Sequence, residues 1–299
     1  MKTIISPVSR ELLLEELHRL GKIRDTRHGG NEIYLFDAAS APNLMREVGR
    51  LREESFRAGG GGTGEEIDID VDDTAPEGYK QLIAWDPAEQ EIVGGYRCII
   101  CPKPDSPHLS TSHYFHFSEQ FRQQFLPQTI ELGRAFVQPK YQASGDCRSI
   151  YALENLWDGI GALIALNPQA KYLLGKVTIY PTYHPEALKL LYYFLHRYFP
   201  DNLALVEGID KVHIDTEKEK NDKIFTGETY LENYRLLRSS IHGYGEMIPP
   251  LMNSYMNLSN TMRVFDTVHN KELGDVYETG IMITIPDIFP EKYDRYTKF

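Results

Sequence analysis

Apolar residues recur along this chain with two periods, which predict its helices and strands. A spacing of three to four residues predicts amphipathic helices at 9–21, 43–58, 149–166 and 184–198. Shorter runs rich in β-branched and aromatic residues predict strands at 32–36, 79–85, 92–100, 129–137, 172–180 and 279–286. Since helices and strands interleave, we expect an α+β fold with a mixed sheet covered by helices.

The strand at 129–137 carries two charged residues, Glu131 and Arg134, with Gly133 between them. Strict alternation would place side chains three positions apart on opposite faces of the sheet. Gly133 tolerates a β-bulge, and a bulge would turn both charges toward one site. The polar turn that follows leads to a helix, whose N-terminus would offer free backbone N–H groups to an anionic group.

Composition narrows the class of protein. A chain of 299 residues with 41% hydrophobic residues can bury a full core. We expect a single domain over 1–299, with an N-terminal helix, a charged insertion near 210–223 and a C-terminal helix–strand extension. No apolar run approaches membrane-spanning length and the N-terminus is too charged for a signal peptide, which predicts a cytoplasmic protein. The formal net charge of −11 argues against non-specific nucleic-acid binding.

Three smaller motifs are interpreted as structural. Cys98 and Cys101 form a CxxC motif without a second pair at zinc spacing, so buried thiols are favoured over a metal site. His113 and His116 lack a third ligand and are expected to pack against aromatic neighbours. The glycine run at 59–62 lacks the Lys-Ser/Thr ending of a phosphate-binding loop and is expected to be a flexible loop.

Four short motifs occur along the chain in an order that points to a protein family. They are Leu51-Arg52 with Phe56, the acidic run with Asp70 and Asp73, the strand from Ile92 to Arg97, and Glu131-Leu132-Gly133-Arg134. In this order, over roughly 9–286, they resemble the GNAT-type N-acyltransferases. The closer resemblance is to the "hemolysin-like" branch that makes ornithine or glycine lipids, a relative of the acyl-homoserine-lactone synthases. It implies a GNAT-like acyl-CoA N-acyltransferase fold, in which a mixed central sheet is splayed between two parallel strands and flanked by helices.

The resemblance also implies a function in lipid biosynthesis. The implied enzyme is an N-acyltransferase that moves a fatty acyl group from an acyl-carrier-protein thioester to the amine of an amino acid of the ornithine or glycine type. Its cofactor would be the acyl-phosphopantetheine of acyl carrier protein, or acyl-CoA, with no metal. Its partners would be acyl carrier protein and the amino-acid acceptor, with no nucleic acid, and we add transient contact with a membrane surface as a further expectation.

The same resemblance assigns residues to roles. Glu131 would be the general base and Arg134 a second catalytic residue. The implied substrate-binding residues are Arg52, Phe56, Asp70, Asp73 and Arg97. The implied cofactor-binding residues are Phe136, Val137, Gln142, Gly145 and Arg148. The competing interpretation is that the charged residues only hold the sheet edge to the first helix.

Two departures from the family pattern bear on the donor and on the acidic run. Cys147 follows Gln142 and Gly145 where acetyl-CoA enzymes carry a small residue, and Asp72 stands where the family usually has an aromatic one. Two other functions stay open: an acetyl-CoA-dependent small-molecule N-acetyltransferase, which Cys147 disfavours, and a non-catalytic acyl-binding module, which needs no base. An acidic carrier protein would dock on basic residues, and the candidates are Lys140, Arg148, Lys171 and Lys176.

Overall fold

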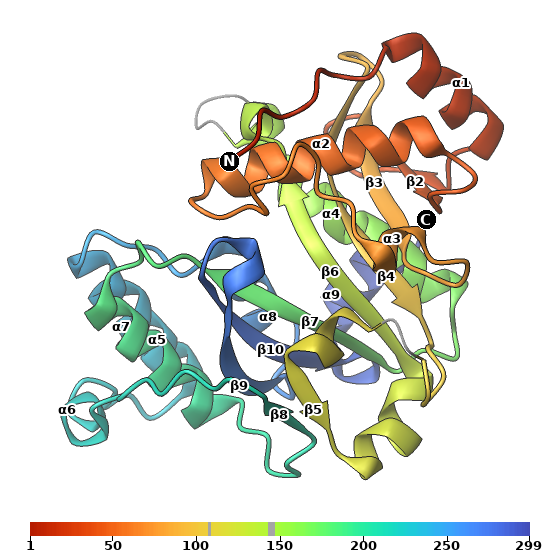
Figure 1. Cartoon of the computed structure of the whole chain (residues 1–299). Coiled ribbons are helices and arrows are strands. Elements are labelled where there is room, and N and C mark those ends of the chain that lie inside the picture. The colour runs from red at the N-terminus through yellow and green to blue at the C-terminus, as the bar shows by residue number, and fades with distance from the viewer. Residues whose placement is uncertain (107–108, 143–146) are drawn as a thin grey trace.

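The computed structural model describes residues 1–106, 109–142 and 147–299 (Figure 1). Within these residues eight strands form one sheet, in which β6 and β7 are the parallel pair. From edge to edge the strands are β1 (Arg24–Asp25), β2 (Glu32–Phe36), β3 (Lys80–Asp86), β4 (Glu91–Ile100), β6 (Thr129–Val137), β7 (Tyr172–Ile179), β10 (Val276–Thr284) and β9 (Arg263–Asn270). The predicted α+β fold with a mixed sheet is confirmed.

The two parallel strands separate along their length. Thr129 to Leu132 on β6 pair with Tyr172 to Gly175 on β7. Beyond these residues β6 and β7 both continue, but the described chain shows no further pairing between them. Figure 1 shows the two arrows diverging. The sheet is therefore splayed between its parallel strands, as the resemblance implied.

A β-bulge in β6 lies against β4. Gly133 pairs with Arg97 whereas Phe136 pairs with Gly95, so β6 holds an extra residue over this stretch. Arg134 takes the left-handed conformation with φ of 47°, which residues other than glycine adopt infrequently. The predicted bulge is confirmed, with Arg134 rather than Gly133 in the unusual conformation.

Helices cover both faces of the sheet and bury two apolar cores. Leu82 and Ile83, adjacent on β3, belong to different cores, which places the cores on opposite faces. On one face α1 (Arg10–Leu20) and α2 (Pro42–Ala58) cover the antiparallel strands. The other core receives residues from α4 (Cys147–Leu166), α5 (Pro185–Tyr198), α7 (Tyr230–Gly243) and α8 (Pro250–Met256). None of the helices in the described part of the chain is both long and apolar enough to cross a membrane.

Short elements complete the fold. They are α3 (Val71–Thr74), α6 (Lys218–Asp222), α9 (Pro290–Thr297) and a separate sheet of β5 (Phe115–Phe117) and β8 (Val206–Gly208). The charged segment at 210–223 contains α6, and its Lys211 forms a β-bridge with Val268. The apolar patterns did not predict α7, β9, β5 or β8, nor the helix α9. The capping box of α7, in which Thr229 and Glu232 bond each other's backbone, was a readable signal for that helix.

The glycine-rich loop after α2 is anchored. The carboxylate of Glu53 accepts hydrogen bonds from the backbone of Thr63 at 2.9 Å and of Gly64 at 2.8 Å. A Cβ atom at Gly59 would lie 2.7 Å from the Tyr180 ring. The glycine run does end α2 at Ala58, as predicted, and its flexibility stays a prediction. Glycine is needed at position 59 because the chain passes close to the Tyr180 side chain, which directly follows β7.

Candidate active site

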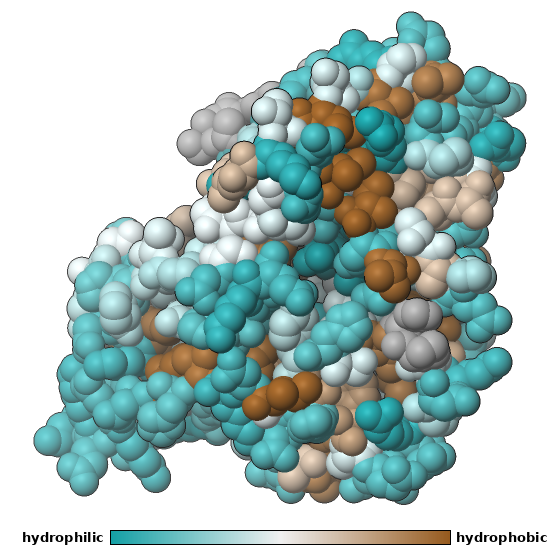
Figure 2. All heavy atoms as spheres, viewed as in Figure 1, coloured by the Kyte–Doolittle hydropathy of each residue, from teal (hydrophilic) through white to brown (hydrophobic). Residues whose placement is uncertain are grey.

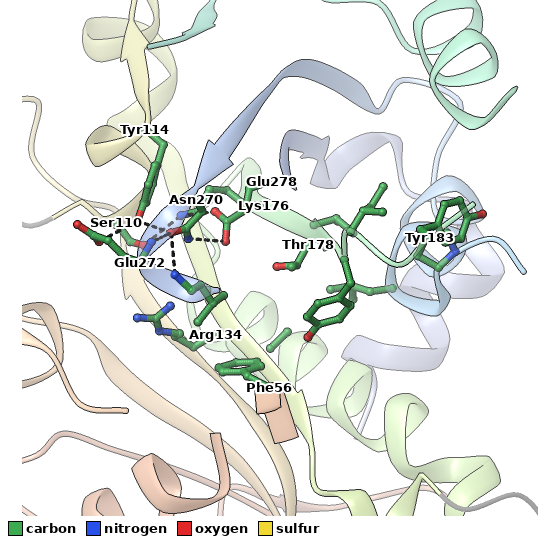
Figure 3. Close-up of a pocket in the computed structure, with 18 of the residues that line it drawn as sticks. Phe56, Ser110, Tyr114, Arg134, Lys176, Thr178, Tyr183, Asn270, Glu272 and Glu278 are labelled. Atoms are coloured by element: carbon green, nitrogen blue, oxygen red, sulfur yellow. Dashed lines mark hydrogen bonds and ion pairs between the residues drawn. The ribbon is translucent and has the colours of Figure 1, made fainter. Parts of the chain in front are cut away.

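A cavity of about 460 Å³ opens where β6 and β7 separate. Gly133 and Arg134 of β6, Lys176 and Thr178 of β7, and Glu278 of β10 line it. Figure 3 shows Ser110, Tyr114, Lys176, Asn270, Glu272 and Glu278 gathered at one end, with Tyr183 toward the other. Much of the remaining wall is apolar or aromatic: Phe56, Val177, Ile179, Tyr180, Tyr183, Met247, Pro249, Pro250 and Leu251. The cavity thus joins a polar end to a largely apolar wall.

The acidic run is fixed by a capping box at the start of α3. The Asp70 carboxylate accepts from the Asp73 amide at 3.1 Å, and the Asp73 carboxylate accepts from the Asp70 amide at 3.2 Å. Arg97 then donates to both carboxylate oxygens of Asp70, at 2.8 and 2.7 Å. The Arg97 guanidinium also lies 4.7 Å above the centre of the Tyr79 ring. Asp70 and Arg97 both line the cavity.

Arg134 reaches the same acidic run from the bulge of β6. Its Nε lies 3.1 Å from Asp68 Oδ2 and its Nη2 lies 3.4 Å from Asp70 Oδ2. Burial raises the pKa of Asp68, and the positive charge of Arg134 opposes that rise. Arg134 and Phe56 line the cavity together with Asp70 and Arg97. The structure therefore brings four of the predicted site residues to one wall.

Arg52 and Asp73 lie behind that wall. Arg52 is fully buried, donates to the Asp73 carboxylate at 3.1 and 3.0 Å, and donates a further hydrogen bond to Gln81. Neither residue lines the cavity. This pair ties α2 to the acidic run and β3, so for these two residues the structure supports the competing interpretation of a scaffold rather than substrate contact.

Glu131 also lies one layer behind the cavity wall. It is 1% exposed, and its Oε1 accepts hydrogen bonds from the Thr111 amide at 2.8 Å and the Thr111 hydroxyl at 2.7 Å. Burial and the Glu131 charge raise the pKa of Tyr79, whose hydroxyl accepts from the Ser110 amide at 2.9 Å. The carboxylate thus orders the segment that carries Ser110 into the cavity wall. Its role as general base stays a prediction.

The polar end of the cavity contains residues that the sequence analysis did not place there. Lys176 Nζ donates to Ser110 Oγ at 3.0 Å and lies 3.8 Å from Glu278 Oε2. Asn270 Nδ2 donates to Glu278 Oε1 at 3.1 Å. Burial lowers the pKa of Lys176, and Glu278 and Glu131 oppose that effect. A charged residue inside each of two otherwise apolar strands was the sequence signal for this pair.

The predicted cofactor-binding residues are only partly described. Phe136 is 5% exposed and packs into the core on the α2 face, and the Gln142 side chain donates a hydrogen bond to the Val137 carbonyl. None of these three side chains lines the cavity. Gly145 lies outside the described residues, as does the side chain of Arg148 in the first turn of α4.

The predicted basic docking residues do not form one exposed group. The Lys176 side chain is 10% exposed and belongs to the cavity, so its assignment to a docking surface is wrong. Lys140 is exposed but pairs with Glu89 at 3.1 Å and Glu91 at 2.8 Å. Lys171 is exposed. The face shown in Figure 2 is largely hydrophilic, with hydrophobic positions in small groups.

The smaller motifs have mixed outcomes. Cys98 is buried, and burial raises its pKa to about 12. Cys101 is half-buried. His113 and His116 are exposed. The ring centres of His113 and Tyr114 are 6.4 Å apart, so packing against an aromatic neighbour is confirmed for His113. Within residues 1–106, 109–142 and 147–299, no group of three or more His, Cys, Asp or Glu side chains is placed to hold a metal.

Comparison with known proteins identifies the family. Residues 51–151, from α2 into α4, match the family described as "Acetyltransferase (GNAT) domain". A glycine N(alpha)-acyltransferase from Bacteroides thetaiotaomicron is 46% identical over 302 residues, covering 99% of this chain and 90% of its own length. One of the same name from Phocaeicola vulgatus is 42% identical and covers 99% of this chain and 93% of its own. The chain belongs to this family of GNAT N-acyltransferases.

This GNAT N-acyltransferase is therefore an enzyme, as the resemblance implied, and its family implies an activated donor of the acyl-CoA type. The crystal structure of the AHL synthase LasI aligns with 50% of this chain and 74% of its own. That alignment has 16% identity and a TM-score of 0.32.

Proposed function

We propose that this acyltransferase moves a fatty acyl group from the thioester of acyl carrier protein to the amine of glycine, in the synthesis of an aminolipid. The observation that carries the proposal is the cavity between β6 and β7, which joins a polar end to a largely apolar wall. The polar end suits a small zwitterion, and the apolar wall suits a hydrocarbon chain. The two curated relatives bear the name glycine N(alpha)-acyltransferase, which supports glycine as acceptor.

The splayed strands supply the geometry for acyl transfer. Because β6 lacks a β7 partner beyond Leu132, the backbone of its second half has an open edge toward the cavity. A thioester lying along that edge would present its carbonyl carbon near the polar end. Holding amine and thioester together in this way lowers the entropic part of the barrier. Backbone N–H groups near Phe136 are the candidate stabilisers of the tetrahedral oxyanion.

Acyl carrier protein is proposed as donor over CoA for a reason in the sequence. The turn after β6 reads Gln142-Ala143-Ser144-Gly145-Asp146-Cys147, and Cys147 replaces the small residue that acetyl-CoA enzymes carry. Loss of that residue weakens the close approach of backbone to a pyrophosphate. A carrier-bound pantetheine needs no such pyrophosphate site.

A donor comparison tests the proposal. The purified protein is given glycine with a long-chain acyl-carrier protein, the matched acyl-CoA or acetyl-CoA, and N-acylglycine is measured by mass spectrometry. We expect kcat/KM to be highest with the carrier and lowest with acetyl-CoA. A preference for acetyl-CoA would instead favour a small-molecule acetyltransferase. A protein that binds acylated carrier but forms no amide with glycine, ornithine or serine would be a binding module.

A further inference from the structure

The polar end of the cavity contains two buried side chains of opposite charge that have no role in the fold described above. Lys176 on β7 and Glu278 on β10 both line the cavity, with side chains only 10% and 5% exposed. Their closest charged atoms are 3.8 Å apart, which is longer than a hydrogen bond. We propose that Lys176 and Glu278 are the two halves of an acceptor subsite for an α-amino acid zwitterion, which rests on the proposed N-acyltransferase function.

Glu278 is held with one oxygen committed and the other available. Asn270 Nδ2 donates to Oε1 at 3.1 Å, and Asn270 Oδ1 accepts from the backbone amides of Glu272 and Leu273, each at 3.1 Å. The turn after β9 therefore fixes the carboxylate. Oε2 is buried and accepts no hydrogen bond from the residues that the structure describes. A buried carboxylate oxygen without a donor is costly, and the ammonium of a bound amino acid would satisfy it.

Lys176 is the complementary half. Its ammonium donates one hydrogen bond to Ser110 Oγ at 3.0 Å and lies 5.5 Å from the centre of the Tyr114 ring. An ammonium has three donors, so donors remain for a carboxylate of the ligand. Ser110 and Tyr114 also line the cavity. Lys176 is thus oriented by neighbours of its own while it faces the space beside Glu278.

This pair discriminates between amines. A bound amine without a carboxylate would leave the Lys176 ammonium without a ligand partner. A bound acid without an amine would leave the Glu278 carboxylate without one. A site built to pair buried charges rejects ligands that leave one of them unpaired. The subsite therefore selects α-amino acids over simple amines such as ethanolamine.

Contact with the acceptor ammonium also gives Glu278 a role in proton transfer. Its Oε2 takes one proton from the acceptor ammonium and returns it to solvent. The freed amine nitrogen attacks the thioester carbonyl carbon, which forms the C–N bond. As the C–S bond breaks, the sulfur leaves as a thiol with the second proton that the nitrogen gives up. Glu131, which lies behind the wall, is then a positioning residue that holds Thr111 and Ser110.

Variants of the two residues test the subsite. Lys176→Met, Lys176→Arg and Glu278→Gln are compared with Glu119→Gln and Lys223→Met, matched changes at exposed positions outside the cavity. For each purified protein, thermal melting checks the fold, and kinetics with long-chain acyl-carrier protein are measured for glycine and for glycinamide, which lacks the carboxylate. Calorimetry measures glycine binding in the absence of donor.

The expected pattern separates the two charges. Lys176→Met should raise the KM for glycine by roughly tenfold to a hundredfold, because a charge-assisted contact is lost. It should make the slow reaction of glycinamide faster, because the lysine charge that glycinamide leaves unmatched is gone, and Lys176→Arg should restore most of the affinity for glycine. Glu278→Gln should lower kcat by roughly 10²–10⁴ for both acceptors, the usual effect of removing a general base. The two control variants should behave as the wild type.

Three results decide against the subsite or against the function. If folded Lys176→Met and Glu278→Gln match the controls while the wild type acylates glycine, the subsite is overturned and the proposed function stands. A wild type that prefers glycinamide or ethanolamine to glycine overturns the subsite as well. If the wild type acylates no acceptor, the proposed function fails, and calorimetry then decides on the subsite. Glycine binding by the wild type that is lost in Lys176→Met supports the subsite. Binding that is unchanged in Lys176→Met, or absent from the wild type, overturns it.

Discussion

Glu131 and Thr111 are joined by two hydrogen bonds to a single oxygen: Oε1 of Glu131 accepts from the Thr111 amide at 2.8 Å and from its hydroxyl at 2.7 Å. These residues belong to different elements, β6 and the segment at 110–113. The bonds fix that segment, and with it Ser110, against the central strand. A residue predicted as a base is thus also a structural anchor.

The first prediction separates these roles of Glu131. Glutamine retains a carbonyl oxygen that can accept from Thr111, so Glu131→Gln should fold and keep kcat within about tenfold of wild type if the residue positions Ser110. Initial rates and melting curves on one preparation measure both quantities. A folded Glu131→Gln protein whose kcat is down by roughly 10²–10⁴ would show that Glu131 is the general base after all.

The second prediction concerns the buried pair of Arg52 and Asp73. Asp73→Asn removes the charge that the fully buried Arg52 guanidinium faces at 3.0 Å. The free energy of unfolding at neutral pH should fall by about 3–5 kcal/mol, the usual cost of breaking a buried ion pair from one side. Denaturant titration measures it. A loss below about 1 kcal/mol, typical of exposed pairs, would contradict the scaffold role.

The same pair has a pH dependence of known sign. Burial alone would raise the pKa of Asp73, but the charges of Arg52 and Arg97 outweigh burial and hold that pKa below its ordinary value. A carboxyl group with a depressed pKa in the folded state stabilises the protein above its unfolded pKa, and this contribution is lost as pH falls through the folded pKa. The stability gap between wild type and Asp73→Asn should therefore narrow below about pH 4.

The third prediction concerns Gly49 on α2, which the acidic run crosses. A Cβ atom there would lie 2.6 Å from Ile69 Cγ1 and 2.7 Å from Ile67 Cγ1. Alanine gains about 1 kcal/mol of helix propensity over glycine, but overpacking costs about 1–3 kcal/mol. Gly49→Ala should therefore lower the melting temperature and displace Asp68 and Asp70. Gly243→Ala, on α7 with no atom within 4 Å, is the matched control and should be neutral or stabilising.

Local patterns were enough to predict most of the sheet and the bulge. The strand at residues 129–137 was predicted with its bounds because its apolar residues alternate and Pro139 follows it. β9 was missed because Arg263, Asp266 and His269 interrupt its apolar pattern. The two strands β5 and β8, three residues each, pair with each other across a long separation in the chain, so no local pattern marks them.

The site was predictable only where its residues sit in recognisable motifs. Arg97, Asp70 and Arg134 belong to such pieces, and they do meet at the cavity. How far each side chain lies behind the cavity wall was not predictable. The spacing of residues along a helix or strand does not show that Arg52 and Glu131 are buried. Lys176 and Glu278 lie far apart in sequence, and only the adjacency of β7 and β10 brings them together.

The last prediction tests whether this cavity is where acyl transfer takes place. Thr178 is half-buried, lines the cavity, and lies opposite Glu278 in the β7–β10 pairing. Figure 3 shows it between the polar end of the cavity and Tyr183. Thr178→Phe would place an aromatic ring in the space that we assign to acceptor and thioester. Misplacing reactants by about 1 Å can cost roughly a hundredfold in rate, so kcat/KM should fall by that factor or more.

The fold should tolerate this change, because the new ring enters an open cavity rather than a packed core. Thr226→Phe, at an exposed position outside the cavity, is the matched control and should keep full activity. Steady-state kinetics with glycine and a long-chain acyl-carrier protein, beside a melting curve for each variant, measure the effect. If Thr178→Phe folds and turns over like Thr226→Phe, then acceptor and acyl chain do not meet between β6 and β7, and both the proposed path of the acyl group and the acceptor subsite beside it are wrong.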